Sequence, residues 1–259
     1  MLRKVSAIKG YSLRANDGEL GTVKDVFFDD EKWTIRYLVV ETGSWLNSRQ
    51  VLISPYSISA LNEADETMDV RLTQEEVRNS PEIDTHQPVS RQMETSLSRH
   101  YGLGHYWLGP ELWGAGALPV VSSPNMNGGG YIPSRTEELL EQAADHMADV
   151  HLRSANDVDG YHIQGSDDAI GHVENFVFDD ETWALRYFVV DTRNWWPGGR
   201  KVLLATHWIE HIDWAHTTVR VNLTQEQIRN SPELDPDLPL NRDLESQLHS
   251  HYGLRNYWE

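Results

Sequence analysis

The chain contains no cysteine among its 259 residues, which excludes disulfides, thiolate metal sites and a thiol nucleophile. Basic residues are also scarce, since 22 Lys and Arg stand against 40 Asp and Glu and leave a formal net charge of -18. A field of this sign repels the phosphate backbone of nucleic acids. We therefore expect no nucleic-acid partner for this acidic protein.

Long apolar runs and catalytic signatures are missing as well. Residues 115–121, one of the longest apolar stretches, fall far short of the ~20 residues that a membrane helix needs. The N-terminus has no apolar core of a secretory signal. No G-x-S-x-G motif, H-E-x-x-H motif or phosphate-binding glycine loop is present. We expect a cytoplasmic protein without a transmembrane segment, which is not an enzyme and has no catalytic, cofactor-binding or metal-binding residues.

What the chain does contain is an internal duplication. Residues 8–107 recur at 158–258, at an offset of 150 that one insertion near Gly198 raises to 151. Residues 21–42 and 171–192 are identical at 12 of 22 positions. Each copy, at about 100 residues, is long enough for its own core. The sequence predicts a first domain over 1–107, a linker over 108–150 and a second domain over 151–259.

Each copy begins with a series of short strand patterns. In the first copy, residues 23–28 alternate between two faces, and an acidic turn leads into an aromatic and β-branched run over 33–40, so a hairpin is expected. Further strands are expected over 51–53, 56–61 and 68–72. About six short strands separated by turns are typical of a small barrel without exposed sheet edges. We predict a mainly β fold with appended helices, built as two six-stranded barrels related by an approximate twofold, like a fused homodimer.

Helices are expected after the strands of each copy. Thr73 with Glu76, and Thr224 with Gln227, fit the capping box that begins a helix. A second helix is predicted over 88–101 and 239–252, where apolar residues at helical spacing end at a glycine. The linker is predicted to hold one more helix over 134–150.

Three segments of the first copy carry a resemblance: residues 17–55, from DGELGTVKDVFF to SRQVLISP, residues 72–84, LTQEEVRNSPEID, and residues 101–107, YGLGHYW. They resemble the PRC-barrel family, named for the H subunit of the photosynthetic reaction centre and shared with a ribosome maturation factor. Residues 151–196 are similar to the second copy of uncharacterised bacterial proteins that hold two such barrels. The resemblance implies a barrel used for docking and no catalytic residue set. The H subunit's membrane helix and the maturation factor's companion domain find no match here, so those two activities are not transferred.

Tryptophans in turns and in the linker are the candidate partner-binding residues. Tryptophan is enriched at interface hot spots, and the predicted contact residues are Trp45, Leu46, Trp113, Trp195 and Trp196. The alternative is that these side chains cap the barrels or seal the junction between the copies. The expected partner is another protein or a second copy of the chain.

Other polar groups have structural explanations. Arg36 and Arg186 interrupt apolar strands and are expected to form ion pairs, because an unpaired buried charge is costly; the candidate partners are Asp25, Glu41 and Asp191. The acidic turns 29–31 and 179–181 are interpreted as solvated, since neither has the ligand spacing of a calcium loop.

The densest histidine group, His207, His211 and His216, leaves a metal-binding alternative open. The sequence favours a non-catalytic protein-interaction or scaffold module. The alternatives are a small-ligand or metal-responsive sensor that binds between the barrels and, less favoured, an unrecognised enzyme.

Overall fold

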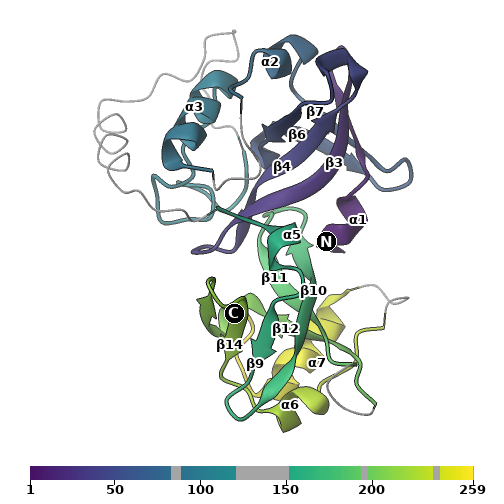
Figure 1. Cartoon of the computed structure of the whole chain (residues 1–259), viewed down its shortest axis with the longest axis vertical. Coiled ribbons are helices and arrows are strands. Elements are labelled where there is room, and N and C mark those ends of the chain that lie inside the picture. The colour runs from purple at the N-terminus through teal and green to yellow at the C-terminus, as the bar shows by residue number, and fades with distance from the viewer. Residues whose placement is uncertain (83–88, 121–151, 194–197, 236–239, 259) are drawn as a thin grey trace. The chain divides into compact units, whose positions relative to one another are not determined.

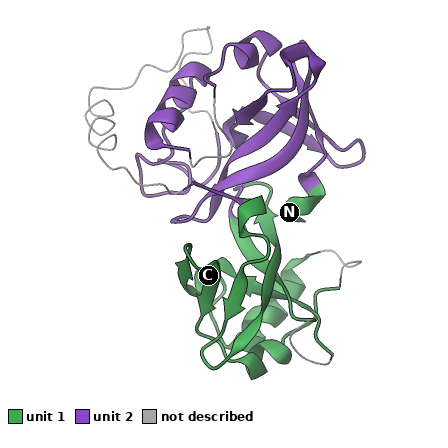
Figure 2. Cartoon of the chain, in the orientation of Figure 1, with its two compact units in different colours: residues 1–7, 155–181, 185–259 green, residues 8–154, 182–184 purple. Residues whose placement is uncertain are grey.

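The computed structural model describes residues 1–82, 89–120, 152–193, 198–235 and 240–258. The predicted linker helix over 134–150 lies outside these residues. The chain divides into two compact units (Figure 2): unit 1 consists of Met1–Ala7, Ala155–Glu181 and Leu185–Glu259, and unit 2 consists of Ile8–Ser154 and Thr182–Ala184. Unit 2 therefore holds most of the first sequence copy, and unit 1 holds most of the second.

Unit 2 is built on a seven-stranded sheet in the order β5-β4-β3-β2-β7-β6, with β8 paired to β3 (Figure 1). The neighbouring strands are antiparallel except β2 and β7, which run parallel. The strands are β2 (Ser12–Ala15), β3 (Gly18–Asp29), β4 (Thr34–Thr42), β5 (Gln50–Ile53), β6 (Ile58–Asn62), β7 (Thr67–Val70) and β8 (Leu152–Ser154).

Unit 1 repeats this sheet with the second copy. Its order is β12-β11-β10-β9-β14-β13, with β1 paired to β10. The strands are β1 (Leu2–Lys4), β9 (His162–Gln164), β10 (Ala169–Asp179), β11 (Leu185–Asp191), β12 (Lys201–Ala205), β13 (Ile209–Asp213) and β14 (Thr218–Val221). No pairing joins β5 to β6, or β12 to β13, in the described residues. Closure of either sheet into a barrel therefore stays a prediction.

The seventh strand of each sheet, residues 2–4 or 152–154, comes from just before the other sequence copy and is counted with that copy. Leu2 is opposite Asp179 and Lys4 is opposite Val177, while Leu152 is opposite Asp29 and Ser154 is opposite Phe27. These registers are equivalent at the offset of 150 residues. Each copy supplies six strands to its own sheet and one short strand to the other. The prediction of six strands in each sheet was therefore wrong, because the exchanged strand makes seven.

An arginine on each exchanged strand fixes its position by an ion pair. Arg3 Nε on β1 lies 2.7 Å from Asp180 Oδ2, and Arg153 Nε on β8 lies 2.9 Å from Asp30 Oδ2. The two pairs are equivalent by sequence, but each joins an arginine of one copy to an aspartate of the other. Ser154 Oγ adds a 2.5 Å hydrogen bond to Asp25 Oδ2.

Both predicted capping boxes form. The Thr73 hydroxyl accepts a hydrogen bond from the backbone N–H of Glu76, and the backbone N–H of Thr73 donates to the Glu76 carboxylate. Thr224 and Gln227 repeat the pattern. Two longer helices end at glycines with left-handed backbone angles, φ 64° at Gly102 and 65° at Gly253. The helices are α1 (Val5–Ile8), α2 (Gln74–Arg78), α3 (Arg91–Tyr101), α5 (Ala155–Val158), α6 (Gln225–Arg229) and α7 (Arg242–Tyr252), with 3-10 turns η1 (Ser44–Leu46), η2 (Pro55–Ser57) and η3 (Thr206–Trp208).

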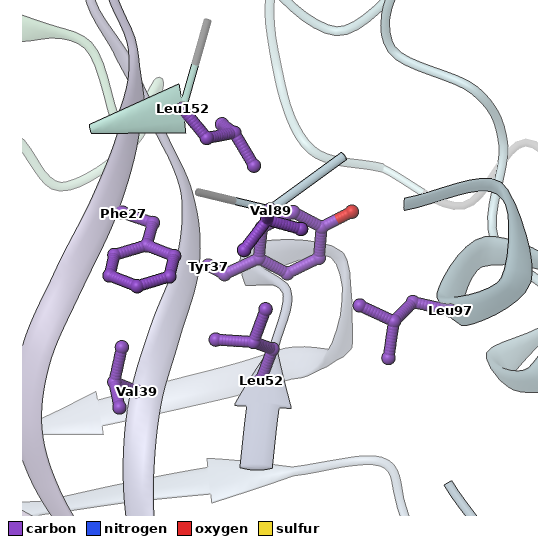
Figure 3. Close-up of a cluster of buried hydrophobic side chains, with 7 residues drawn as sticks. All are labelled: Phe27, Tyr37, Val39, Leu52, Val89, Leu97 and Leu152. Atoms are coloured by element: carbon purple, nitrogen blue, oxygen red, sulfur yellow. The ribbon is translucent and has the colours of Figure 1, made fainter. Parts of the chain in front are cut away.

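One hydrophobic core cluster of unit 2 lies between the sheet and α3 (Figure 3). Leu97 of α3 is buried there, and Met93 and Tyr101 of the same stripe pack against it, as the helical spacing predicts. Leu152 of the exchanged strand β8 belongs to the same cluster. The other buried members are Phe27, Tyr37, Val39, Leu52 and Val89. The exchanged strand therefore contributes to the core as well as to the sheet edge.

Candidate functional site

Each unit contains a cluster of five charged and aromatic residues that are the same in both copies. We call the first set, in unit 2, the Arg36 cluster, and the second set, in unit 1, the Arg186 cluster. The Arg36 cluster consists of Asp29, Arg36, Arg91, Glu94 and Tyr106, and the Arg186 cluster consists of Asp179, Arg186, Arg242, Glu245 and Tyr257.

Local structure brings the Arg36 cluster together from three places. Asp29 is the last residue of β3, and Arg36 lies on β4 after the hairpin turn. Arg91 and Glu94 occupy the first turn of α3. A carboxylate at this position interacts favourably with the positive end of the helix dipole. Tyr106 follows the glycine that ends α3 and turns the chain back toward the sheet.

Arg36 is the centre of this cluster. Its Nη2 lies 2.9 Å from Asp29 Oδ2, and its guanidinium lies 3.7 Å from the ring centre of Tyr106. The Tyr106 hydroxyl donates to Glu94 Oε1 at 2.5 Å, and Arg91 Nη1 lies 2.8 Å from Glu94 Oε2. The charges alternate along this chain of contacts, so each is balanced by a neighbour.

Burial dominates the electrostatics of the cluster. It raises the pKa of Glu94 to about 7, although Arg91 and the Tyr106 hydroxyl favour the charged carboxylate. Burial and the neighbouring Glu94 also hold the pKa of Tyr106 well above its ordinary value. Tyr106 is therefore a stable hydrogen-bond donor at neutral pH.

Residues 109–113 lie over the Arg36 cluster, and we call them the cover segment. Arg36 Nη1 donates to the Leu112 carbonyl at 2.6 Å, and the Trp113 ring centre lies 4.9 Å from the guanidinium. Lys32 Nζ donates to the carbonyls of Gly109 and Glu111 at 2.9 and 2.7 Å. Arg36 is consequently 0% exposed.

A further contact fixes the aromatic end of the cover segment. The Tyr56 hydroxyl donates to the Trp113 carbonyl at 3.0 Å, and the two rings meet edge to face at 4.8 Å. The segment turns back on itself through a hydrogen bond from Glu111 N to Gly114 O at 3.0 Å. The cover is therefore a compact turn held by its main-chain carbonyls and by one tryptophan.

The Arg186 cluster has the same contacts but is more open. Arg186 lies 3.5 Å from Asp179 and its guanidinium lies 4.2 Å from the Tyr257 ring centre. The Tyr257 hydroxyl donates to Glu245 Oε1 at 2.8 Å, and Arg242 Nη1 lies 3.1 Å from Glu245 Oε2. The Arg186 side chain is 21% exposed.

Residues near the Arg186 cluster are also more exposed than their counterparts in unit 2. His207 is exposed and Tyr257 is half-buried, whereas their counterparts Tyr56 and Tyr106 are buried. Leu254 is 40% exposed, against 5% for Leu103. We call Arg186, His207, Arg255 and Tyr257 the open surface of unit 1.

His207 is a neutral group on this surface. Its ring stacks on His249 with ring centres 5.6 Å apart and an interplanar angle of 17°. Partial desolvation of its ring and the neighbouring His249 lower the pKa of His207 below its ordinary value. A neutral imidazole offers one N–H donor and one acceptor.

The predicted partner-binding residues have different environments. Trp45 is half-buried in η1, where its Nε1 donates to the Leu20 carbonyl at 2.8 Å, and Leu46 beside it is also half-buried. Trp113, the last residue of the cover segment, is buried rather than exposed, and its ring lies against the Arg36 guanidinium. Trp195 and Trp196 lie outside the described residues.

The predicted partners of the buried arginines were wrong. Asp25 bonds to Ser154, Glu41 lies 3.0 Å from Lys24 Nζ, and Asp191 pairs with Arg193 at 2.5 Å. The arginines pair instead with the first aspartate of each acidic turn.

Asp29 therefore corrects the prediction of a fully solvated acidic turn. It is buried, and it accepts hydrogen bonds from the backbone N–H groups of Glu31 and Lys32 as well as from Arg36. The other members of each cluster, on the first turn of the long helix and in the terminal Tyr-Trp, were missed as functional residues. Their identity in both copies was the signal that could have identified them.

The three histidines of the metal alternative lie on different elements. His207 is in η3, His211 is exposed on β13, and His216 bonds to Asp213 Oδ2 at 2.8 Å in the following turn. Across the described residues, no three His, Asp or Glu side chains form a group that could hold a metal ion. A membrane-crossing helix is also absent from this described part, since none of its helices is long and apolar enough.

Comparison with known proteins finds a family match in the first part of the chain. An uncharacterised protein of Deinococcus radiodurans is 31% identical over 78 residues, which are 30% of this chain and 28% of that protein. The chain therefore matches less than a third of the length of that relative. Residues 2–77 match the family model of the PRC-barrel domain. The predicted resemblance to the PRC-barrel family is confirmed over residues 2–77.

Proposed function

We propose that the protein is a non-catalytic protein-interaction scaffold, with the open surface of unit 1 as its docking site. The observation that carries this proposal is the unequal exposure of two clusters made of the same residues. Arg36 is fully covered and Arg186 is 21% exposed. A partly exposed guanidinium beside an aromatic ring is a frequent anchor at protein interfaces.

We propose for the fold that both units are PRC-type barrels related by an approximate twofold, as a fused homodimer would be. The equivalent registers of the exchanged strands support this proposal. In such an arrangement unit 2 is the covered form of the module and unit 1 is the open form. The proposal assigns no catalytic step to the chain and no role in nucleic-acid binding.

The test is affinity capture from native lysate, with identification of the captured protein, on matched variants. His207→Asp places a negative charge on the open surface, and His211→Asp places the same charge on the exposed face of β13 in the same unit. A partner that is captured by wild type and by His211→Asp, and lost from His207→Asp, supports the proposal. If every captured protein is retained equally by both variants, the open surface is not the docking site.

A further inference from the structure

We propose that His207 and His249 form a proton-operated switch, which holds residues 254–258 in place near neutral pH and releases them when both rings are protonated. The inference goes beyond the docking proposal, because the switch belongs to unit 1 and can be measured without a partner. It acts on the open surface, since residues 254–258 include Arg255 and Tyr257.

Both histidines bond to the same residue of this segment. His249 Nδ1 lies 2.8 Å from the Arg255 carbonyl oxygen, and the His207 ring also forms a hydrogen bond with the Arg255 main chain. The two rings stack with their centres 5.6 Å apart and an interplanar angle of 17°. The stacked pair therefore fixes the segment at Arg255.

The hydrogen bonds of His249 fit a positively charged ring. A carbonyl oxygen only accepts, so Nδ1 carries a hydrogen. Nε2 lies 3.2 Å from the Tyr187 hydroxyl, which donates its only hydrogen to Glu245 Oε1 at 2.9 Å. Nε2 must then donate to the hydroxyl oxygen, so both ring nitrogens carry hydrogen. His249 is 1% exposed and therefore needs a nearby opposite charge.

Glu245 supplies that opposite charge through Tyr187. The titratable and charged side chains near the histidine pair are Tyr187 and Arg186 of β11, Glu245 and Arg242 of α7, Asp179 of β10, Tyr257 and the exposed Arg255. Arg186 pairs with Asp179. Arg242 lies 3.1 Å from Glu245, but its side chain is 57% exposed, so water screens its charge.

A proton on His249 opposes a second proton on His207. Partial desolvation of the ring, then His249 and Arg186, hold the pKa of His207 below its ordinary value of 6.5. The released ring binds its proton more tightly than the stacked ring does. The closed arrangement is therefore most stable above pH 6.5 and loses stability as pH falls below 6.5 toward the lowered pKa of His207.

The switch is confined to unit 1. Tyr56 and Ser98 occupy the positions of the two histidines in the first copy, and Gly104 occupies that of Arg255. Neither a tyrosine nor a serine gains a proton in mildly acidic solution. The first copy therefore provides the replacements that remove the switch from the second.

The first test is an NMR pH titration of the histidine ring nitrogens in the full chain. We expect His249 to carry hydrogen on both ring nitrogens while His207 is still neutral. His249→Phe keeps a stacked ring and removes the charge, so the midpoint of His207 should rise by at least about half a pH unit, the repulsion of two unit charges 5.6 Å apart in water. His249→Ser should act in the same direction.

The matched control for this titration is His211→Phe, which alters an exposed histidine on β13 of the same unit. It should leave the midpoint of His207 where it is in wild type. Protonation of His207 before His249, or a His207 midpoint that rises in neither His249 variant, would overturn the inference.

The second test follows the order of residues 254–258 by the 15N heteronuclear NOE at about pH 7.5 and about pH 5, on either side of the histidine range. Wild type and the control His211→Tyr should lose order at the lower pH. His207→Tyr cannot take up the second proton and should keep the segment ordered at both values. Equal order of the wild-type segment at both values, or the same loss in His207→Tyr, would show that the histidine pair does not hold it.

Discussion

Arg36 and Arg186 occupy equivalent positions, but their surroundings bury the first completely and the second only in part. Arg36 contacts Asp29, the Leu112 carbonyl and two aromatic rings and has no exposed surface. Arg186 pairs with Asp179, lies against the Tyr257 ring and is 21% exposed. A buried ion pair that loses one partner leaves an uncompensated charge, whereas a partly exposed pair is screened by water.

Replacement of each arginine by leucine should therefore have unequal effects on stability. Arg36→Leu leaves the buried Asp29 carboxylate unpaired and should cost about 3 to 5 kcal/mol, whereas Arg186→Leu should cost clearly less, because its site is partly solvated. Hydrogen exchange of the β4 amides in unit 2 and the β11 amides in unit 1 measures the two losses separately. Equal losses in the two units would contradict the assigned difference in burial.

Glu94 should titrate near neutral pH, because burial raises its pKa from 4.5 to about 7. The folded protein then holds this proton more tightly than the unfolded chain does between about pH 4.5 and 7. Its contribution to the free energy of unfolding is present below pH 4.5 and is lost as pH rises through 7. A carbon-detected NMR titration of the Glu94 carboxyl should give a midpoint near 7, and Glu94→Gln should remove the signal. A midpoint close to 4.5 would show that the carboxyl is solvated.

At the scale of elements, local signals predicted most of the secondary structure. The capping boxes at Thr73 and Thr224 and the glycines after the long helices each satisfy backbone groups within a few residues, so sequence alone identifies them. The predicted helix over 88–101 begins later, at Arg91, because Ser90 accepts a hydrogen bond from Met93 N and forms the N-cap.

The exchanged strands could not be predicted in this way. β1 and β8 have only three residues each, and both carry Leu-Arg before a polar residue. Their acceptors on β10 and β3 are equally alike, each with a Phe-Asp-Asp sequence at the strand end. Either strand fits either acceptor by local chemistry, so the choice depends on the path of the whole chain.

A charge exchange between Arg3 and its partner should show which strand pairs where. Arg3→Asp places two carboxylates together at Asp180 and should increase hydrogen exchange in β10 of unit 1, although Arg3 belongs to the first sequence copy. Adding Asp180→Arg should restore protection by re-forming the pair.

The matched control for this experiment is Arg3→Asp with Asp30→Arg. Asp30 is the partner that an unexchanged strand would use, and in the structure it pairs with Arg153. This combination should give no rescue, because it also disrupts the β8 pair. Rescue by Asp30→Arg and not by Asp180→Arg would mean that β1 pairs within its own copy.

For the whole molecule, the exchange means that neither sheet is complete without a strand from the other copy. A chain with two ordinary tandem domains separates when the connection between them is cut. Here β1 from the N-terminal half pairs with β10 in the C-terminal half, and β8 from the C-terminal half pairs with β3 in the N-terminal half. Two independent pairings thus join the halves, and each raises the effective concentration of the other.

Cutting the chain between Gly128 and Gly129 through an inserted protease site should therefore leave one particle. We expect the cut protein to elute in size-exclusion chromatography at the volume of the intact chain and to separate into two fragments only in denaturant. The same cut in an Arg3→Asp, Arg153→Asp variant should release the fragments on dilution, because both ion pairs that fix the exchanged strands are lost. If the wild-type fragments separate in native buffer, the exchanged strands do not hold the halves together, and the copies behave as independent domains.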